Sequence, residues 1–468
     1  MSELKNRELL ISYAFPPTNT TTSNVVAKRI LDEKKSVDVV CGRLDNLSKD
    51  YTMENVLKEY ISSKYVIDID FSIEWDNIKF FSTKAMETLD SLDVYEKIYS
   101  RAFFSHSHFL ALEYKLAHPE TYWRAEFSDP LVKPLGRRTS SKINDEEYVK
   151  RMNELLKARN FELISCEDDV NAICEYLTYL YADEIIFINK NQRRVMIEDS
   201  RFDVENIINE KSTISPHPTL DDKYYNIIKS NYEVDENYLN FAYFGNIFSK
   251  RSFEDFISSF ENVDDEIKIR IHIFSNNKTL FEQILSNKIF DKVILNEEVN
   301  YLEFLNLTKK FDVLLVEDSY TLSDCEINPY LPSKLSDYIG SETSVWAVCE
   351  KNSPMYSMDI EYKSILGDYS SNISTINQII NDKLNLTLKN TALDEKIYAR
   401  QRVNHLTQKI TELIDVAEME FKKDAEYEKR IAELNHKIEE LENEKSDIVN
   451  SNSWKLTKNF RKIGKKFK

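Results

Sequence analysis

The stretch FDVLLVEDSYTLSDCEINPYLPSKLSDYIGSETSVW, residues 311–346, decides the fold of this chain. It predicts a buried strand over 311–316, a long polar loop, a short helix opened by Pro332-Ser333 and closed by Gly340, and a second apolar strand over 344–348. In open α/β sheets such a loop and helix N-terminus lie beyond the carboxyl ends of the strands, where ligands bind. The loop is therefore a candidate binding site.

The same alternation of apolar strands and amphipathic helices extends to both sides of this stretch. Strands are predicted at 9–13, 37–41, 66–69, 101–104, 122–127 and 184–188, and then at 239–244, 269–274, 292–295, 313–316 and 345–348. Alternation of this kind predicts parallel, doubly wound sheets. The expected fold class is α/β, with two Rossmann-like doubly wound domains that face a cleft.

A chain of 468 residues is too long for one ordinary core, so we expect several parts. The stretch 224–237 is the predicted hinge between the two Rossmann-like domains. The expected parts are an N-terminal Rossmann-like domain (1–235), a C-terminal Rossmann-like domain (236–393), a closing helix (394–420), a coiled coil (421–452) and a basic amphipathic tail (453–468).

The predicted coiled coil rests on a heptad pattern of apolar residues. Five of them fall in one a/d register: Ile431, Leu434, Ile438, Leu441 and Ile448. The seam is short, so its partner is either a second copy of the chain, another protein or the body of this chain.

The tail carries seven basic and no acidic residues between Lys455 and Lys468. On a helix, Leu456, Phe460, Ile463 and Phe467 share one face and leave the lysines on the other. This pattern is typical of an anchor on a membrane surface, and we expect residues 454–468 to bind one. The alternative is a frayed basic tail.

The composition of the chain argues against some classes of function and indicates the cellular compartment. The chain has 80 acidic and 62 basic residues, a formal net charge of −18, which argues against nucleic-acid binding. The five cysteines are scattered and form no C-x-x-C pair, as is typical of a protein in a reducing cytoplasm. No apolar run approaches the roughly 18 residues of a membrane span. We therefore expect a cytoplasmic protein, peripheral at the inner face of the cell membrane.

Four segments carry a resemblance to a known family: ISYAFPP (11–17), RAEFSDP (124–130), YFGNIFSKRSFEDFI (243–257) and NPYLPSKLSDYIG (328–340). Together the chain over 9–415 resembles a glycosyltransferase of the two-Rossmann (GT-B) class, specifically the retaining family 4, also called glycosyl transferases group 1. The resemblance implies that the C-terminal domain binds a nucleotide-sugar and the N-terminal domain an acceptor. It implies no cofactor besides the nucleotide-sugar co-substrate, and no metal.

The resemblance also implies residues that bind the donor. Gly245-Asn246 is similar to the turn at which the backbone approaches the donor, which needs a residue without Cβ. Arg251, with Lys250, matches the basic position that contacts the diphosphate. Ser333-Lys334 adds a second cation and a helix N-terminus for phosphate oxygens. Such fixed cations and dipoles would stabilise the charge that builds on a nucleoside-diphosphate leaving group.

The chain departs from the family pattern at two places. Asp337 stands where the family has the second glutamate of a glutamate pair, which binds the ribose hydroxyls. The first glutamate is missing, because Glu326 lies too far ahead and Pro329 occupies its place. After the two prolines of the first loop, residues 18–22 are threonine and asparagine, where relatives often have glycine.

On the acceptor side, Asp129 follows a predicted strand and resembles the polar position near the reacting centre in relatives. The alternative, with equal weight, is an aspartate that caps the turn before Pro130. Arg137 is a candidate for an acceptor phosphate, although an ordinary surface cation is the simpler interpretation. His106 and His108 are acceptor-side candidates that either line the cleft or pack in the core; a metal pair lacks a third ligand.

The leading hypothesis is transfer of a sugar from a nucleotide-sugar to a glycan or lipid-linked acceptor in cell-surface polysaccharide or teichoic-acid-type biosynthesis in bacteria. The basic tail supports a membrane-associated acceptor, because an acidic body needs a local cationic anchor to approach anionic lipid. The alternative is a non-catalytic GT-B scaffold or stabilising subunit that acts through its coiled coil. A transferase of phosphoalcohols with the same fold is a weaker third candidate.

Overall fold

The computed structural model describes residues 7–132, 141–246, 250–285, 287–321 and 326–384, together with the single residue 436. The chain divides into two compact units, residues 1–387 and 388–468. The first unit contains both predicted sheets, and the predicted closing helix, coiled coil and basic tail lie outside the described residues apart from His436.

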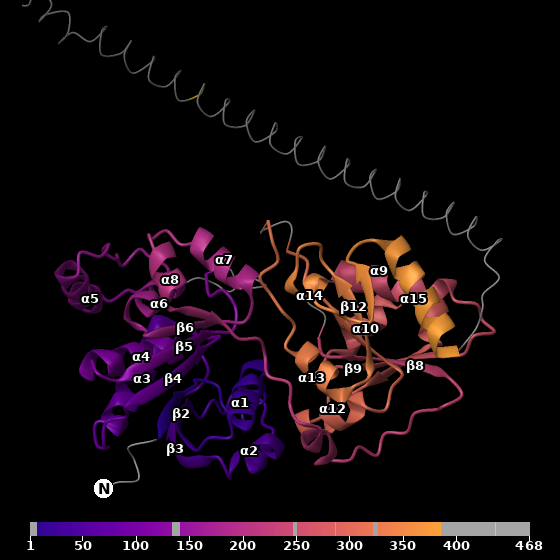
Figure 1. Cartoon of the computed structure of the whole chain (residues 1–468), viewed down its shortest axis with the longest axis horizontal. Helices are drawn as coiled ribbons and strands as arrows, with labels where there is room; N and C mark the ends of the chain where they lie inside the picture. The colour runs from indigo at the N-terminus through magenta and orange to yellow at the C-terminus, as the bar shows by residue number, and fades with distance from the viewer. Residues whose placement is uncertain are drawn as a thin grey trace, which may run out of the picture. The chain divides into compact units, whose positions relative to one another are not determined.

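The first sheet has seven parallel strands in the order β3-β2-β1-β4-β5-β6-β7 (Figure 1). Its strands are β1 (Glu8–Ile11), β2 (Val37–Gly42), β3 (Ile61–Ile67), β4 (Lys97–Ala102), β5 (Tyr122–Phe127), β6 (Glu184–Phe187) and β7 (Ser212–Ile214). Its helices are α1 (Thr21–Glu33), α2 (Tyr51–Leu57), α3 (Trp75–Leu89), α4 (His106–Ala117), α5 (Glu146–Ala158), α6 (Val170–Tyr181), α7 (Lys190–Glu198) and α8 (Glu205–Lys211).

The second sheet has six parallel strands in the order β10-β9-β8-β11-β12-β13. Its strands are β8 (Leu239–Phe244), β9 (Ile269–Phe274), β10 (Val293–Asn296), β11 (Val313–Glu317), β12 (Ser344–Cys349) and β13 (Tyr362–Ile365). Its helices are α9 (Lys250–Ser258), α10 (Lys278–Ile284), α11 (Asn287–Phe290), α12 (Tyr301–Thr308), α13 (Lys334–Ser341), α14 (Pro354–Ser357) and α15 (Tyr369–Leu384). The two predicted parallel-sheet domains are thus confirmed.

Both sheets are covered on both faces, which explains why their strands read as continuous apolar runs. In β11, Val313 and Leu315 pack in one core with residues of α9 and α15, whereas Leu314 and Val316 pack in another with residues of α13. Side chains alternate along a strand, so the inner strands β8, β9, β11 and β12 each supply residues to both cores.

Several predicted boundaries are wrong. β3 covers 61–67 rather than 66–69, because this strand near the edge of the sheet is half polar and its first residues lack an apolar pattern. β4 covers 97–102 rather than 101–104. The two short edge strands β7 and β13 were not predicted. The helix after the first loop, α1, starts at Thr21, because the Thr20 side chain accepts a hydrogen bond from the Ser23 backbone N–H.

Gly340 does not close the helix of the opening stretch. α13 continues through it to Ser341 and ends at Glu342, whose φ is 61°. A Cβ on Gly340 would lie 2.2 Å from the Tyr225 hydroxyl oxygen, so this glycine allows close packing instead of a cap. The start of the stretch predicted to be a hinge is packed: Tyr225 is fully buried, and its hydroxyl donates to the Asp337 backbone oxygen at 2.7 Å.

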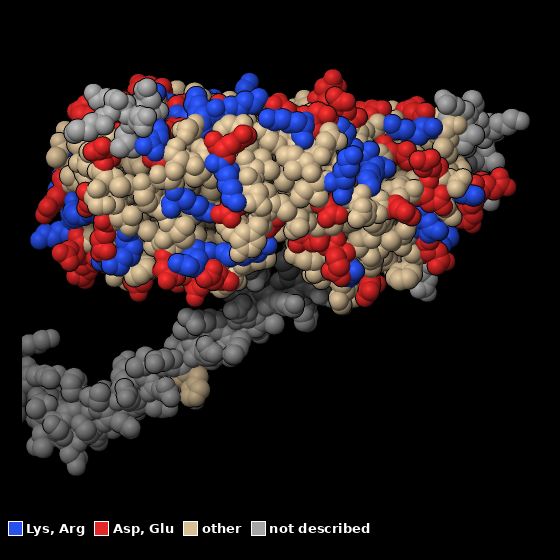
Figure 2. Space-filling model, turned by 90° about the horizontal axis from the view of Figure 1, so that it is seen from below, with Lys and Arg blue, Asp and Glu red and all other residues tan. Residues whose placement is uncertain are grey.

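Charged side chains of both signs intermingle on the face shown in Figure 2, without an extended basic surface there. Within the described ranges, no helix is both long enough and apolar enough to cross a membrane.

Candidate functional site

The candidate site lies at the carboxyl ends of β8 and β11, which are neighbours in the second sheet. The chain leaves β8 toward β9 on one side and leaves β11 toward β12 on the other. The strand order reverses between them, and the crevice at such a switch point is where ligands bind in open α/β sheets. Gly245 directly follows β8, and Glu317 is the last residue of β11. We call this region the switch-point crevice.

Gly245 has a backbone φ of +113°, a conformation that residues with a side chain rarely adopt. Its N–H donates to the Phe274 backbone oxygen at 2.9 Å, which fixes the turn at the end of the strand. A Cβ built there would lie 3.5 Å from the Lys334 Nζ atom. The glycine therefore leaves the backbone open next to a cation.

Lys334 is the first residue of α13 and reaches across the end of the sheet. Its Nζ donates to the Phe244 backbone oxygen at 2.8 Å and lies 4.3 Å from the centroid of the Tyr243 ring. Burial lowers the pKa of Lys334 to about 8, although the nearby Glu317 opposes this shift. An ammonium has three N–H donors, and Phe244 is its one hydrogen-bond acceptor among the described residues. Two donors remain for a ligand.

Glu317 was missed by sequence reasoning. It is half-buried, and its Oε2 atom is buried with no hydrogen-bond partner in the part of the chain that the structure describes. Burial raises the pKa of Glu317 to about 8, against the opposing effect of Lys334. The signal that could have identified it is an acid at the end of an apolar strand, directly before the loop predicted to bind a ligand.

Asn246 supports the turn after Gly245. Its Oδ1 accepts a hydrogen bond from Ser275 Oγ at 2.9 Å, and its backbone oxygen accepts one from the Tyr243 hydroxyl at 3.0 Å. Lys250 and Arg251 begin α9 shortly after this turn, but their side chains lie outside the described residues. Their contact with a diphosphate stays a prediction.

Asp337 lies in a buried network with a helix of the first sheet. Its Oδ1 accepts from Lys28 Nζ at 2.8 Å and from the Tyr301 hydroxyl at 2.7 Å. Lys28 also donates to Ser336 Oγ at 2.7 Å and to the Ser333 backbone oxygen at 3.4 Å. Asp337 is only 3% exposed and Lys28 is 1% exposed, so this network is closed off from solvent. In this structure the hydrogen bonds to the Asp337 carboxylate come from Lys28 and Tyr301. Its binding to ribose stays a prediction.

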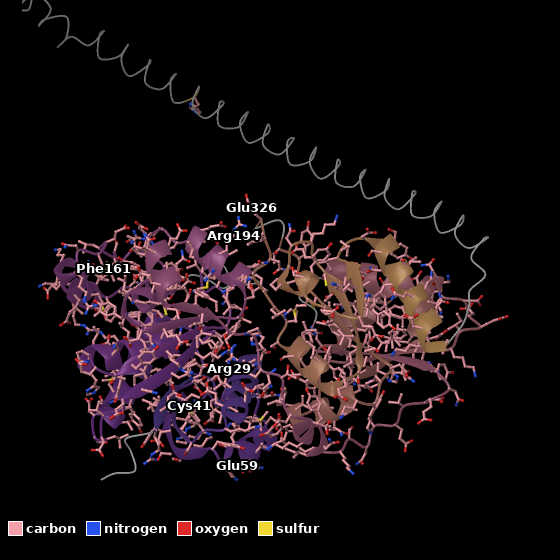
Figure 3. The ribbon with its side chains drawn as sticks, viewed as in Figure 1. Arg29, Cys41, Glu59, Phe161, Arg194 and Glu326 are labelled. Atoms are coloured by element: carbon pink, nitrogen blue, oxygen red, sulfur yellow. The ribbon has the colours of Figure 1, made fainter. Side chains whose placement is uncertain are left out.

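Two residues of the loop before α13 meet α7 of the first sheet. Glu326 is exposed and lies near Arg194, as Figure 3 shows near the top of the view. The hydrogen bond with Glu198 is the main cause that raises the pKa of Arg194, and Glu326 adds to it. The Pro329 backbone oxygen accepts from Asn189 Nδ2 at 2.9 Å. The position of the family's first glutamate is therefore a buried packing position in this chain.

A second polar cluster lies at the carboxyl ends of β4 and β5, and sequence reasoning missed it as well. The fully buried Glu126 accepts from Arg101 Nε at 2.8 Å, from Arg29 Nε at 3.0 Å and from the Tyr99 hydroxyl at 2.8 Å. Burial alone would raise the pKa of Glu126, but Arg29 and Arg101 outweigh it and lower the pKa. Arg101 also donates to Thr22 Oγ1 at 2.7 Å, which ties the start of α1 to this sheet.

The two candidate histidines are both buried, each 1% exposed, and they have different surroundings. His108 Nδ1 lies 2.8 Å from Ser100 Oγ, and its ring packs against Phe127 in the core. His106 stacks on Tyr13 with ring centroids 3.7 Å apart, and its Nε2 lies 2.9 Å from Asn77 Oδ1. The packed alternative therefore describes His108.

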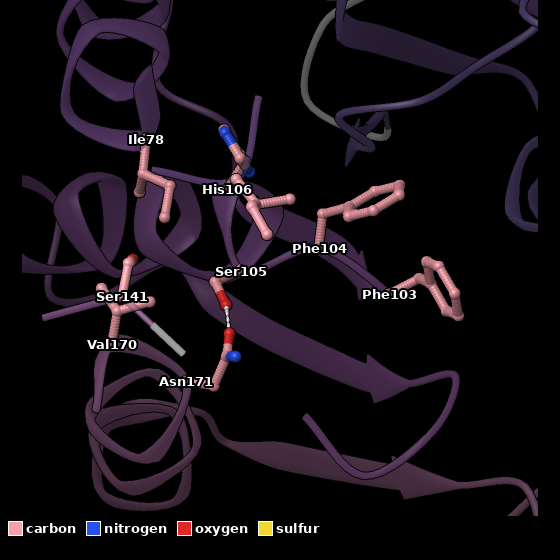
Figure 4. Close-up of a pocket in the computed structure, with 9 residues that line it drawn as sticks. Ile78, Phe103, Phe104, Ser105, His106, Ser141, Val170 and Asn171 are labelled. Carbon is pink, nitrogen blue, oxygen red and sulfur yellow. Dashed lines mark hydrogen bonds between the residues drawn. The ribbon is translucent and has the colours of Figure 1, made fainter. Parts of the chain in front are cut away.

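His106 lines a small cavity at the start of α4 (Figure 4). Ser105 Oγ donates to Asn171 Oδ1 at 2.6 Å on its wall. The cavity volume of about 20 Å³ suits a single water molecule and is far too small for a sugar. Burial lowers the pKa of both His106 and His108 to about 3, so both rings are neutral at physiological pH.

Asp129 follows β5 after one intervening residue and is half-buried. Its role in catalysis or in the turn before Pro130 stays open. Arg137 lies outside the described residues. Within the described residues, no group of three or more His, Cys, Asp or Glu side chains is placed to hold a metal ion.

Comparisons with known proteins identify the fold. The chain is similar to the crystal structure of HepE from Anabaena in complex with UDP, at a TM-score of 0.51 and 11% identity, covering 87% of this chain and 99% of that chain. It is also similar to the structure of sucrose-phosphate synthase from Thermosynechococcus elongatus, with a TM-score of 0.51 and 10% identity. The match covers 86% of this chain and 99% of that chain. A third similar structure is that of OtsA without ligand, with a TM-score of 0.51 and 10% identity. The match covers 85% of this chain and 94% of that chain. No protein-family model matches the chain, and no curated protein matches its sequence.

At such low identity these similarities show the fold alone. Two parallel α/β sheets, the second with its strand order reversed between β8 and β11, define this chain as a protein of GT-B fold.

Proposed function

We propose that this protein is a glycosyltransferase that moves a sugar from a nucleotide-sugar to a glycan or lipid-linked acceptor. The expected setting is cell-surface polysaccharide or teichoic-acid-type biosynthesis, with the protein held at the membrane through residues 454–468. The resemblance to family 4 carries the finer assignment, and the GT-B fold together with the solved UDP complex of HepE supports the class of donor.

The observation that carries the proposal is the pair formed by Gly245 and Lys334. A Cβ built on Gly245 would lie 3.5 Å from the Lys334 ammonium, at the point where the strand order reverses. A diphosphate can approach such a backbone closely, and the ammonium meets the charge that grows on the leaving group as the glycosidic bond breaks. The helix N-terminus that begins at Lys334 adds backbone N–H donors.

The test is release of nucleoside diphosphate from a panel of nucleotide-sugars, followed by mass spectrometry. We expect Lys334→Ala to lower kcat/KM for the active donor by at least about 100-fold, because removal of a single donor to a developing oxyanion typically costs this much. Lys310→Ala is the matched control: Lys310 also donates to backbone oxygens, those of Ser230 and Tyr232, but outside the crevice. If Lys334→Ala were as active as Lys310→Ala, the proposed role of this site in sugar transfer would be wrong.

One observation favours a second candidate, a non-catalytic scaffold that keeps the fold. The carboxylate of Asp337 is already paired with Lys28 and Tyr301, and Pro329 stands in place of a glutamate. A scaffold should bind none of the nucleotide-sugars. Calorimetric titration of the wild-type protein with the same panel separates the two candidates, because a transferase must bind at least one donor.

A further inference from the structure

Glu317 is a half-buried acid at the end of β11, and the family resemblance gives it no role. It ends β11 directly beside the strand that leads into Gly245. Within β11, Val313 and Leu315 point to the face of the sheet covered by α9. Side chains two residues apart in a strand point to the same face, so Glu317 points to that face as well. Its side chain therefore extends the same face on which Tyr243 lies.

The charged and titratable groups around Glu317 come from three elements. Lys334 reaches it from α13, Tyr243 from β8, and Asp318 follows it at the end of its own strand. Among the described residues, the Lys334 ammonium and the Glu317 carboxyl are thus close enough to influence each other, and Asp318 acts on the pKa of Glu317 in the opposite direction to Lys334. No ion pair of 4.0 Å or less joins them among the described contacts, since the Lys334 ammonium donates to Phe244 instead.

A nucleoside diphosphate that enters this crevice brings at least two negative charges to the vicinity of Lys334. An ionised carboxylate in the same half-buried space would repel it, and the repulsion is strong where little water screens the charges. A protonated carboxyl would instead offer an O–H donor to a phosphate oxygen. The Oε2 atom of Glu317 is buried and has no hydrogen-bond partner among the described residues, so a phosphate oxygen that reaches it would supply the missing partner.

We propose that Glu317 contacts the donor in this crevice and that its carboxyl is protonated when a nucleoside diphosphate binds, so that binding is coupled to the uptake of a proton. The inference rests on the proposed use of a nucleotide-sugar. The raised pKa of Glu317, about 8, agrees with a carboxyl that keeps or takes up its proton at this place.

The experiment is calorimetric titration of the full-length protein with UDP at pH 7.0 and pH 9.0. We expect the wild-type affinity to fall by at least about tenfold at the higher pH, because both Glu317 and Lys334 lose protons over this range. In Glu317→Gln the amide cannot ionise and still offers an N–H donor. Between pH 7.0 and pH 9.0 the fold decrease in its affinity for UDP should be at least about three times smaller than in wild type. The decrease that remains comes from the loss of the Lys334 proton.

The number of protons taken up is measured at pH 8.5 by titration in two buffers of different ionisation enthalpy. We expect wild type to take up more protons than Glu317→Gln. Glu282→Gln is the matched control, because it removes one acid at an exposed position of α10 and should keep the wild-type profile. Circular dichroism checks the fold, and Glu317→Met replaces the glutamine variant if that variant unfolds.

Two results would overturn the inference. Equal pH dependence and equal proton uptake in wild type and a folded Glu317 variant would remove the role of Glu317 and leave the proposed function intact. Absence of binding by the wild-type protein to UDP, GDP, ADP and dTDP at either pH would overturn both proposals.

Discussion

Glu175 shows how strongly burial acts on single side chains in this protein. It lies in α6 and is 4% exposed, and its Oε1 accepts from the Leu131 and Val132 backbone N–H groups at 2.7 and 3.2 Å. Burial raises its pKa to about 7, although these hydrogen bonds oppose the shift. The folded state therefore holds a proton that the unfolded chain releases near pH 4.5.

The sign of the resulting pH dependence follows from that difference. A pKa that is higher in the folded state gives a stabilisation that is complete below pH 4.5 and is lost as the pH rises toward 7. In Glu175→Gln the amide cannot ionise and keeps an acceptor oxygen for the two N–H groups. We expect the free energy of unfolding of wild type, relative to this variant, to fall by about 3 kcal/mol between pH 4.5 and pH 7.5.

Urea unfolding at a series of pH values measures this difference. Glu154→Gln serves as the control, because it removes one acid at an exposed position of α5. A difference for Glu175→Gln that does not change with pH would mean that Glu175 titrates normally in the folded protein.

At the scale of elements, the main feature is the contact of α1 in the first sheet with α13 in the second. Lys28 and Asp337 form a buried ion pair at 2.8 Å, and Tyr301 of α12 completes the network. Around it, Leu302 and Leu305 of α12 pack in one core with residues of α1 and α2. The two sheets therefore share a core as well as a polar contact.

We expect Lys28→Met to destabilise the protein by about 3 kcal/mol, because it leaves the Asp337 carboxylate buried without its cation. The double variant Lys28→Met/Asp337→Leu should recover part of this loss, since no unpaired charge remains. Urea unfolding of both variants gives the comparison.

Lys34→Met is the matched control for this pair. Lys34 also belongs to the end of α1 and pairs with Asp221 at 2.9 Å, but both side chains are about half exposed, at 51% and 55%. Its unfolding midpoint should not change measurably, because water screens such pairs. A loss in Lys28→Met no larger than in Lys34→Met would show that the buried pair does not join the sheets.

At the scale of the whole molecule, charge is distributed unevenly along the chain. The formal net charge is −18, yet seven basic and no acidic residues lie between Lys455 and Lys468. We expect full-length protein to sediment with vesicles that contain phosphatidylglycerol and a chain ending at Ser453 to remain in solution, because only the tail can offset repulsion between the acidic body and anionic lipid.

Phosphatidylcholine vesicles provide the control for this prediction, and binding should weaken as salt is added. Equal sedimentation of the two chains with anionic vesicles would show that the tail is not the anchor.

The sequence by itself determined the two parallel sheets, because strands buried on both faces must be apolar along their whole length. The predicted strands 239–244 and 269–274 agree with β8 and β9 residue for residue. Edge strands such as β7 and β13 escaped prediction, since they are short and only partly buried. The donor-binding roles of Gly245 and Lys334 come from the family resemblance and stay predictions, whereas the positions of the two residues, after β8 and at the start of α13, follow from local patterns.

Only the tertiary structure decided which side chains share a space. Glu317 comes next to Lys334, and Lys28 next to Asp337, through contacts between residues far apart in the chain. The same holds for Gly340, which sequence reasoning made a helix end and which the Tyr225 hydroxyl makes a packing position. Local patterns determine where the chain forms strands and helices, whereas burial and the partners of each charge depend on which elements pack together.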